Sequence, residues 1–315
     1  MLMTFADVEE RLAVALPGYE PREQQQRAAQ AIEGLFSRHL DHDPIRRQPT
    51  NLAVQAGCGV GKSLAYLIPA ILAAINHGRR TVISVTTKAL QAQIASKDMP
   101  FLEEHLGEPF TWCVLKGRSN YFCAAVAENA SAGDVPSLAA ILRHAEQHPE
   151  WEGTQDGLPF QVPAGEWSQV ASDSDTCRDL GCKDALADGV AGCYAEAARA
   201  RARTRQIVLA NHALFFTDLS LRAQGVPGML GEYDFVVLDE AHEAESVAGD
   251  TLGGRLVQHT FVSLAREVWN WVRAYAPERQ EQVGTAADRL TMATGALFGD
   301  AGLPVGRIRN ATLNE

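Results

Sequence analysis

The stretch Ala56-Gly57-Cys58-Gly59-Val60-Gly61-Lys62-Ser63 decides the fold of this chain. Small residues in such a loop let backbone N–H groups close around phosphate oxygens, and the following helix points the positive end of its dipole there. The ammonium of Lys62 can reach the β- and γ-phosphates of a nucleotide, and the hydroxyl of Ser63 suits Mg²⁺. The stretch therefore predicts an ATP-binding loop in which Gly57, Gly59 and Gly61 allow close approach of the phosphates.

The residues on both sides of this loop predict a strand before it and a helix after it. Residues 52–54 read as a buried strand, and residues 64–75 as a mostly apolar helix that Pro69 interrupts. The loop begins with Ala56, where the usual pattern has glycine, and short patterns of this kind also arise by chance. The alternative interpretation is a glycine-rich turn with a surface lysine.

A second landmark, Val236-Val237-Leu238-Asp239-Glu240-Ala241-His242, ends an apolar stretch far along the chain. Asp239 can hold the Mg²⁺ shell at the carboxyl end of a strand, and Glu240 can orient or deprotonate the attacking water. The alternative is an acidic helix start that merely favours the helix dipole. Because that alternative must explain the two landmarks separately, we predict one ATP-hydrolysing site with Lys62, Asp239 and Glu240 as catalytic residues.

The N-terminal segment Tyr19-Glu20-Pro21-Arg22-Glu23-Gln24-Gln25 precedes a helical stretch at 26–36. The amide of Gln25 offers a donor and an acceptor that match the N6 and N7 edge of adenine, and Arg22 can stack on the base or hold the loop. Glutamine and arginine before a helix are also ordinary surface residues. We therefore take Arg22 and Gln25 as candidate nucleotide contacts only together with the two landmarks.

Short apolar stretches alternate with helical ones along the chain. The predicted strands span 81–85, 112–115, 207–210 and 235–238, with a helix at 88–97. This alternation is typical of an α/β fold with a mostly parallel sheet covered on both faces. Prolines and glycines weaken the pattern between 129 and 175, which indicates an insertion. The chain is predicted to be helical again at 261–275 and 283–297, with Trp269 and Trp271 packed among the apolar positions.

Composition limits the class of protein. The 315 residues suffice for one large or two medium domains, and 46% hydrophobic residues can fill a proper core. The first ten residues carry acids and do not read as a secretory signal, and the longest apolar stretch suits a buried helix rather than a bilayer span. We therefore expect a globular, cytoplasmic protein with no membrane partner.

The formal net charge of −11 argues against a protein that coats nucleic acid with its whole surface. Two basic neighbourhoods remain, and the aromatic residues Tyr121 and Phe122 lie beside the first. The basic residues are Lys116, Arg118, Arg199, Arg201, Arg203 and Arg205. They indicate either a local track for nucleic acid or the solvated face of a helix.

The chain has six cysteines, and their distribution suggests ligation rather than disulfides. They are Cys58, Cys113, Cys123, Cys177, Cys182 and Cys193. The first two lie in the loop and in a predicted strand, and we expect them to behave as small apolar residues. In a reducing compartment the other four thiols suggest metal or cluster ligation rather than disulfides, but their spacing is irregular for a zinc site. A cluster, a zinc site and unligated thiols all stay open on spacing alone.

Taken in order, these pieces resemble the DinG and XPD family of superfamily two DNA helicases, and the DinG branch most closely. The resembling segments are 19–25, 57–67, 86–93, 116–123, 210–214 and 239–242. The most specific of them is Lys116-Gly117-Arg118-Ser119-Asn120-Tyr121-Phe122-Cys123, which is similar to the family's entry into its cluster domain. The resemblance implies a RecA-like motor domain with an inserted iron–sulfur domain and the start of a helical arch.

The resemblance also implies site residues and an activity. Cys123, Cys177, Cys182 and Cys193 would ligate a 4Fe-4S cluster, although the interval between the last two is longer than the family leads us to expect. The implied DNA contacts are Thr86, Thr87, Lys116, Arg118, Tyr121 and Asn211, and His242 would couple the nucleotide to them. The implied activity is ATP-driven 5′–3′ movement along single-stranded or forked DNA.

The expected domains follow from these segments. Residues 1–116 would form the first part of the ATP-binding domain, 117–204 the cluster domain, 205–250 the return into the motor, and 251–315 the start of the arch. A motor of this type needs a second RecA-like domain, which supplies an arginine to the γ-phosphate. No segment after residue 250 resembles one. We therefore expect weak hydrolysis by the chain alone and a second domain in a longer protein or on a second polypeptide. The alternative function is a non-motor accessory protein that binds nucleotide and DNA, or a truncated helicase remnant.

Overall fold

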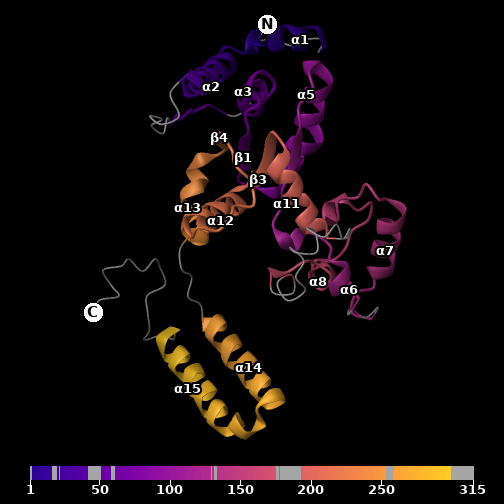
Figure 1. Ribbon diagram of the computed structural model, residues 1–315, viewed down its shortest axis with the longest axis vertical. Helices are drawn as coiled ribbons and strands as arrows, with labels where there is room; N and C mark the ends of the chain where they lie inside the picture. The colour runs from indigo at the N-terminus through magenta and orange to yellow at the C-terminus, as the bar shows by residue number, and fades with distance from the viewer. Residues whose placement is uncertain are drawn as a thin grey trace, which may run out of the picture. The chain divides into compact units, whose positions relative to one another are not determined.

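The computed structural model describes residues 2–15, 20, 22–41, 51–57, 61–128, 130, 133–174, 177, 193–252 and 258–298. The chain divides into two compact units, Met1–Leu252 and Gly253–Glu315. The first unit contains a sheet with helices around it, and the second contains a pair of helices (Figure 1).

Four parallel strands form the sheet of the first unit, in the order β2-β3-β1-β4. They are β1 (Thr81–Val85), β2 (Trp112–Val114), β3 (Ile207–Asn211) and β4 (Phe235–Leu238). In the register of the sheet, Val85 lies beside Asn211 and Ser84 beside Leu238. The carboxyl ends of β1, β3 and β4 therefore share one edge. The predicted α/β fold with a parallel sheet is confirmed, and each strand lies within one residue of its predicted bounds.

Alternate strand residues pack against helices on opposite faces of the sheet. Ile83 and Leu209 belong to one apolar core, whereas Val82 and Val208 belong to another. The first core includes residues of α1 (Phe5–Ala15), α2 (Glu23–Asp41), α3 (Lys62–His77) and α5 (Met99–Leu106), and the second includes residues of α11 (Tyr194–Thr204), α12 (His212–Ala223) and α13 (Ala241–Leu252). Burial on both faces explains why the strands are continuous apolar runs.

The helix after the loop, α3, begins at Lys62 and continues through Pro69 to His77. Proline removes one backbone donor inside a helix, but every residue from Ala65 to Ala74 is buried, and this packing holds the helix together. The helix ends where Gly78, with a φ of 63°, donates its N–H to Ala74 O over 2.9 Å. Between β1 and β2 the chain forms α4 (Lys88–Gln93), a π-helical turn (Ile94–Asp98) and α5.

Residues 52–54 contradict the prediction of a buried strand, because they form no strand in the described part of the chain. Leu52 and Val54 are 40% and 47% exposed. They line a cavity together with Val236 and Leu238 of β4, which is an edge strand within the described sheet. An edge strand such as β4 presents free backbone groups, but residues 52–54 form no ladder with it in the described sheet.

The segment between β2 and α11 has an apolar core of its own. That core contains Phe122, Ala127, Val135, Ile141, Trp151, Val162, Trp167, Val170 and Ala171. Its helices are α6 (Ala124–Ala127), α7 (Leu138–Gln147) and α8 (Ala164–Ser168). Tyr194, at the start of α11, packs against this core and lies so close to Gly153 that a Cβ there would be 2.1 Å from the ring. We call residues 117–193 the insert. Its expected boundaries stay predictions.

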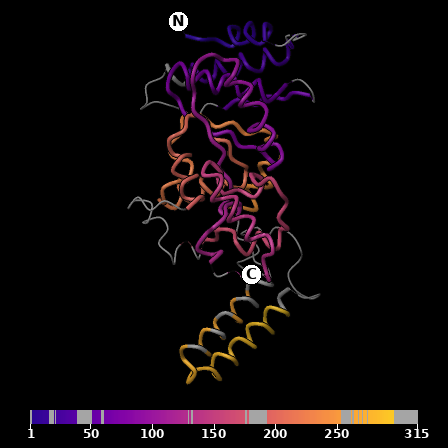
Figure 2. Tube along the Cα trace, turned by 90° about the vertical axis from the view of Figure 1, so that its right-hand side faces the viewer, coloured from indigo at the N-terminus to yellow at the C-terminus, as the bar shows by residue number. Residues whose placement is uncertain are grey.

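The second unit consists of α14 (Gln258–Tyr275) and α15 (Gln280–Phe298), joined by a short 3₁₀ turn (Pro277–Arg279). The two helices lie side by side in both views (Figure 1, Figure 2). Trp269 is half-buried, with Arg273 over its ring at 5.4 Å. Trp271 is 59% exposed, so the prediction that it packs inside is wrong. No helix in the described ranges has the length and apolar character needed to cross a membrane.

Candidate functional site

The two sequence landmarks meet at the carboxyl edge of the sheet. Lys62 Nζ lies 2.7 Å from Glu240 Oε1, although the two residues are 178 positions apart. Lys62 begins α3 and Glu240 follows β4, and their side chains are 35% and 38% exposed. The hydrogen bond from Lys62 lowers the pKa of Glu240, which keeps the carboxylate ionised at neutral pH. The predicted pairing of the loop with the acidic motif is therefore present in the structure.

Asp239 is held by donors from two directions. Tyr66 Oη donates to Asp239 Oδ2 over 3.1 Å, and Glu240 N donates to Asp239 Oδ1 over 3.0 Å. Burial, and then the nearby charge of Asp239, raises the pKa of Tyr66, so the phenol stays a donor. Glu240 has a φ of 50°, the one positive value outside glycine among the described residues. Strain of this kind is common at functional sites.

A cavity of about 580 Å³ opens beside these groups. Its polar lining includes Gln25, Lys62, Tyr66, Asp239, Glu240 and His242. Its apolar lining includes Phe36, Leu52 and Val237. The volume falls in the range of small-molecule sites, and its lining suits a ligand with a charged end and an apolar end.

Gln25 contacts the end of the loop directly. Its Nε2 donates to Gly61 O over 2.9 Å, and its side chain is buried. Gly61 has a φ of 86°, and a Cβ at this position would lie 2.5 Å from Gln25 Nε2. Only glycine combines this backbone conformation with this contact without strain. The structure therefore places Gln25 on the wall of the cavity, next to the loop.

The other loop candidates take different positions. Arg22 and Gly57 are exposed, and Ser63 is half-buried in the first turn of α3, within hydrogen-bonding reach of Tyr66. Gly59 lies outside the described residues. His242 is 71% exposed, with Nδ1 3.5 Å from Glu240 Oε2.

Three candidate DNA contacts lie at the carboxyl ends of β1 and β3. Thr87 Oγ1 accepts a hydrogen bond from Leu90 N over 3.1 Å and caps α4. Asn211 Oδ1 accepts from Leu214 N over 2.8 Å and caps α12. Thr86 Oγ1 is buried without a hydrogen-bond partner in the described part of the chain. Two of the three side chains thus already fix helix starts at this edge.

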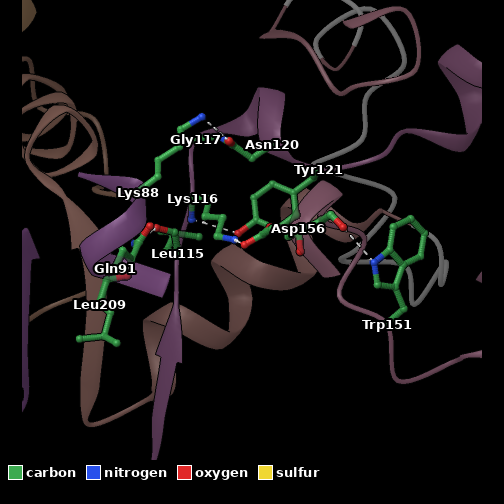
Figure 3. A network of polar contacts seen from close by, with 11 residues as sticks. Lys88, Gln91, Leu115, Lys116, Gly117, Asn120, Tyr121, Trp151, Asp156 and Leu209 are labelled. Atoms are coloured by element: carbon green, nitrogen blue, oxygen red, sulfur yellow. Dashed lines mark hydrogen bonds and ion pairs between the residues drawn. The ribbon is translucent and has the colours of Figure 1, made fainter. Parts of the chain in front are cut away.

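The other three candidate DNA contacts lie where β2 leads into the insert. Lys116 Nζ pairs with Asp156, and Lys116 N donates to Tyr121 Oη over 3.0 Å (Figure 3). Tyr121 is 2% exposed, and the side chain of Arg118 is 11% exposed. In this structure the ring of Tyr121 therefore has no free face for a base, because it packs inside the second core.

A second cavity, of about 700 Å³, lies between α4 and the insert. Its lining includes Lys88, Lys116, Asn120, Asp156 and Phe160. Lys88 Nζ donates to Asn120 Oδ1 over 2.7 Å, across the gap between α4 and the first turn of the insert (Figure 3). We call this cavity the α4 groove.

Three of the four candidate cluster ligands lie in the described residues, and Cys182 lies outside them. Cys123 and Cys177 are buried, Cys193 is half-buried, and none of these three thiols is part of a disulfide. No group of three or more His, Cys, Asp or Glu side chains is gathered as a metal site in the ranges described. Burial raises the pKa of the Cys113 thiol in β2 to about 11, which fits the apolar role expected for it.

A buried group of charges adjoins Cys177. Glu196 Oε1 accepts from Arg118 Nη2 over 2.7 Å and from Arg199 Nη1 over 3.1 Å. Burial lowers the pKa of Arg118, but its interactions with Cys177 and Glu196 outweigh burial and raise it. Arg118 Nη1 is buried and has no hydrogen-bond partner among the described residues. The single carboxylate of Glu196 thus pairs with two guanidinium groups beside the thiol of Cys177.

Tyr66 and His212 lie in segments 57–67 and 210–214, which carry the resemblance, but the sequence patterns assigned no role to them or to Glu196. Tyr66 follows Lys62 by four positions and so shares its helix face, which could have been recognised. Glu196 is a single acid ahead of a run of arginines, which could also have drawn attention. Segment 210–214 includes His212, but nothing in the segment reveals its contacts, because its partners are Ser84 of β1 and Asp239 directly after β4.

Residues 24–120 match the DEAD/DEAH box helicase family. The chain is 32% identical over 291 residues to the ATP-dependent DNA helicase YoaA of Escherichia coli, which covers 89% of this chain and 42% of that protein. It is 30% identical over 290 residues to the ATP-dependent helicase DinG of Mycobacterium tuberculosis, at 85% and 41%. It is also 30% identical over 253 residues to the 3′-5′ exonuclease DinG of Bacillus subtilis, at 78% and 25%.

The chain therefore spans less than half the length of these curated relatives. The parallel sheet and the matched family are consistent with a RecA-like motor domain. Because the similarity to YoaA and DinG extends over most of the chain and the helicase match covers the loop, the chain belongs to the DEAD/DEAH box helicase family, among its DinG-like members.

Proposed function

We propose that this chain binds Mg·ATP in the cavity beside Lys62 and hydrolyses it as part of a DNA helicase of the DinG type. One observation carries the proposal: Lys62 Nζ and Glu240 Oε1, from two landmarks 178 positions apart, lie 2.7 Å apart at the sheet edge. A glycine-rich turn and an unrelated helix start have no reason to meet in this way. The names of the relatives favour a motor over the accessory protein.

The pair between Lys62 and Glu240 suggests how binding prepares the chemistry. The phosphates of ATP carry more negative charge than one carboxylate and draw the ammonium of Lys62 to themselves. Glu240 then loses the hydrogen bond that lowers its pKa, so its basicity rises while a water molecule takes the place of the ammonium. The pair with Lys62 thus keeps Glu240 weakly basic until ATP arrives.

Mg²⁺ fits the donors present, because Asp239 and Ser63 supply the oxygen ligands that it prefers. Each oxygen of Asp239 accepts one hydrogen bond and keeps lone pairs for a metal. When bound, Mg²⁺ would neutralise charge on the phosphates. Tyr66 holds the carboxylate in the orientation that this requires.

We place DNA along the edge formed by Thr86, Thr87 and Asn211 and in the α4 groove. That groove combines lysines, amides and the ring of Phe160, which is the mixture that single-stranded nucleic acid favours. Lys116 would contribute its charge to the groove that it lines, Arg118 would act from behind this surface, and Tyr121 would support the turn that carries them. Polarity of 5′–3′ and single-stranded or forked substrates remain part of the proposal.

A 4Fe-4S cluster held by Cys123, Cys177, Cys182 and Cys193 also remains a proposal. The buried charges beside Cys177 fit it: within the described residues Arg118 Nη1 has no hydrogen-bond partner, and a cluster with thiolate ligands is an anionic group that a guanidinium can face. When bound, the cluster would cross-link the segments that carry its ligands. Residues 117–204 would then form the cluster domain between motor segments 1–116 and 205–250, with 251–315 starting an arch.

Two further expectations complete the proposal. The cytoplasm is the expected location, in line with the DNA helicases among the bacterial relatives. The relatives give no support to a separate polypeptide that would carry a second motor domain, so we do not include one.

The test of the nucleotide and DNA sites is ATP hydrolysis by the 315-residue chain with and without single-stranded DNA. We expect slow hydrolysis, as for a motor without its second RecA-like domain, with a rate that DNA raises modestly. Lys88→Ala in the α4 groove should lower the affinity for DNA several-fold. Lys97→Ala, which removes the same charge from the π-helical turn, is the matched control. Equal DNA affinity in all three proteins would contradict the groove, and hydrolysis unaffected by DNA would contradict coupling.

The cluster has its own test on the protein purified without oxygen. We expect iron and sulfide near four each per chain and broad visible absorbance. Cys177→Ser should remove the absorbance, whereas Cys113→Ser, at a buried cysteine in β2, should keep it. Zinc alone, or unchanged iron in Cys177→Ser, would overturn the ligand assignment.

A further inference from the structure

His212 closes a ring of hydrogen bonds at the carboxyl edge of the sheet. Its Nδ1 lies 2.6 Å from Ser84 Oγ, and its Nε2 lies 2.9 Å from Asp239 O. Asp239 N in turn donates to Ser84 O over 2.9 Å. His212 begins α12 directly after β3, so its ring reaches across β1 to the end of β4.

The hydrogen-bond partners of the His212 imidazole decide which of its two nitrogens carries the proton. Asp239 O is a carbonyl and can only accept, so Nε2 must carry the hydrogen. The imidazole is buried, and burial favours its neutral form. A neutral ring protonated at Nε2 has a free lone pair on Nδ1, and the hydroxyl of Ser84 donates to it. The ring is 1% exposed, so water does not compete.

The carbonyl that His212 holds belongs to the peptide bond before Glu240. Glu240 has a φ of 50°, a value that an L-residue adopts only when its surroundings hold it there. This turn aims the carboxylate of Glu240 at Lys62. A donor that fixes the preceding carbonyl therefore also fixes the direction of the proposed catalytic carboxylate.

The second contact of the imidazole, from Nδ1 to Ser84 Oγ, connects it to the proposed DNA edge. Ser84 lies two residues before Thr86, on the strand that ends at the cap of α4. His212 itself follows Asn211, whose side chain caps α12. One buried ring thus joins the ends of β1, β3 and β4.

We propose that His212 is a positioning residue that holds the Asp239–Glu240 turn in its strained form and ties it to the strand ends that carry Thr86 and Asn211. This inference rests on the proposed ATP site, since it names what aims the carboxylate there. It assigns no proton transfer to His212, which does not reach the cavity.

Two substitutions separate the two contacts of the ring. In His212→Gln the side-chain amide can replace Nε2 and donate to Asp239 O, but it loses Ser84. In His212→Asn the amide can replace Nδ1 and bond to Ser84 Oγ, but it is too short for Asp239 O. Ser84→Ala removes the Ser84 contact alone and leaves the ring in place.

The kinetic test measures single-turnover hydrolysis and the affinity for Mg·ATP separately. We expect His212→Asn to hydrolyse bound ATP about 10- to 100-fold more slowly, with affinity within about threefold of wild type, because the carboxylate is misaimed and the phosphates are still held. His212→Gln should keep the rate within about threefold. Equal rates in the two variants, both slow or both fast, would overturn the proposal.

Nitrogen NMR of the histidine rings tests the contact without reference to activity. Comparison with His212→Gln assigns the His212 signal among the nine histidines. We expect a neutral ring protonated at Nε2 at pH 7, and an amide signal of Glu240 that shifts in His212→Asn more than in His212→Gln. A proton on Nδ1, or a Glu240 signal that moves in neither variant, would overturn the inference. A wild-type chain that turned over no ATP would instead defeat the proposed function, and these signals would still decide the contact.

Discussion

The sheet edge and the contact between the insert and α11 each contain an ion pair with a 2.7 Å separation, and the two pairs differ in their surroundings. The side chains of Lys62 and Glu240 are 35% and 38% exposed, whereas those of Arg118 and Glu196 are 11% and 6% exposed. Water screens the first pair, so little stability depends on it and Lys62 can change partners. Breaking the second would leave a charge buried without a partner. Exposure, rather than distance, separates a pair that can act as a switch from one that supports a fold.

The largest effect that we expect is on stability, from Glu196→Ala. This change leaves Arg118 and Arg199 without their shared carboxylate and should cost about 3–5 kcal/mol of the free energy of unfolding. Urea denaturation measures it. Glu240→Ala, which breaks the exposed pair, is the matched control and should stay within about 1 kcal/mol of wild type. Equal losses in the two variants would end the distinction between the pairs.

Lys62→Ala should act on ligand binding rather than on the fold. Loss of the ammonium should weaken Mg·ATP binding about 30-fold, or roughly 2 kcal/mol, because a charged contact to the phosphates disappears. Isothermal titration measures the affinity, and thermal unfolding should show almost no change. A large fall in the unfolding temperature with unchanged affinity would reverse the roles that we give to the two pairs.

Gly61→Ala tests the contact between the end of the loop and Gln25 at the sheet edge. Gly61 and Gly78 both have positive φ, so alanine at either position should cost about 1–2 kcal/mol of stability. A Cβ at Gly61 also meets Gln25, whereas a Cβ at Gly78 meets nothing within 4 Å. Gly61→Ala alone should therefore weaken ATP binding, by about tenfold. The same affinity in both variants would remove Gln25 from the site.

The smallest effect is a change in the titration of Glu240. Its pKa lies below the ordinary value of 4.5 because Lys62 bonds to the ionised form. The pair therefore contributes at neutral pH and is lost as the pH falls through the lowered pKa. Carboxyl NMR should show the pKa of Glu240 rising in Lys62→Ala. An unchanged titration would mean that the pair is not formed in solution.

The sequence predicted the strands well and their surroundings less well. β1 and β4 coincide with their apolar runs, because turn residues before β1 and an acidic motif after β4 mark where these runs begin and end. Residues 52–54 have the same apolar character but do not pair with the edge strand β4, and no local pattern reveals whether such a ladder forms.

In the site, too, the sequence predicted some residues, whereas the positions of others depend on tertiary packing. Lys62 and Glu240 were predicted as partners because their chemistry demands a common ligand. Tyr121 was expected at the surface beside basic residues, but packing in the second core buries it. His212 could not be recognised, because its contacts depend on the order β3-β1-β4, which places β1 between its own strand and β4.

The central claim is that Lys62 and Glu240 form one ATP-hydrolysing site, and Glu240→Gln tests it most directly. ATP affinity and single-turnover hydrolysis should be measured on the same preparation. The account predicts binding at least as tight as wild type, because no carboxylate competes for Lys62, with hydrolysis at least about 100-fold slower. Hydrolysis at the wild-type rate would contradict the account.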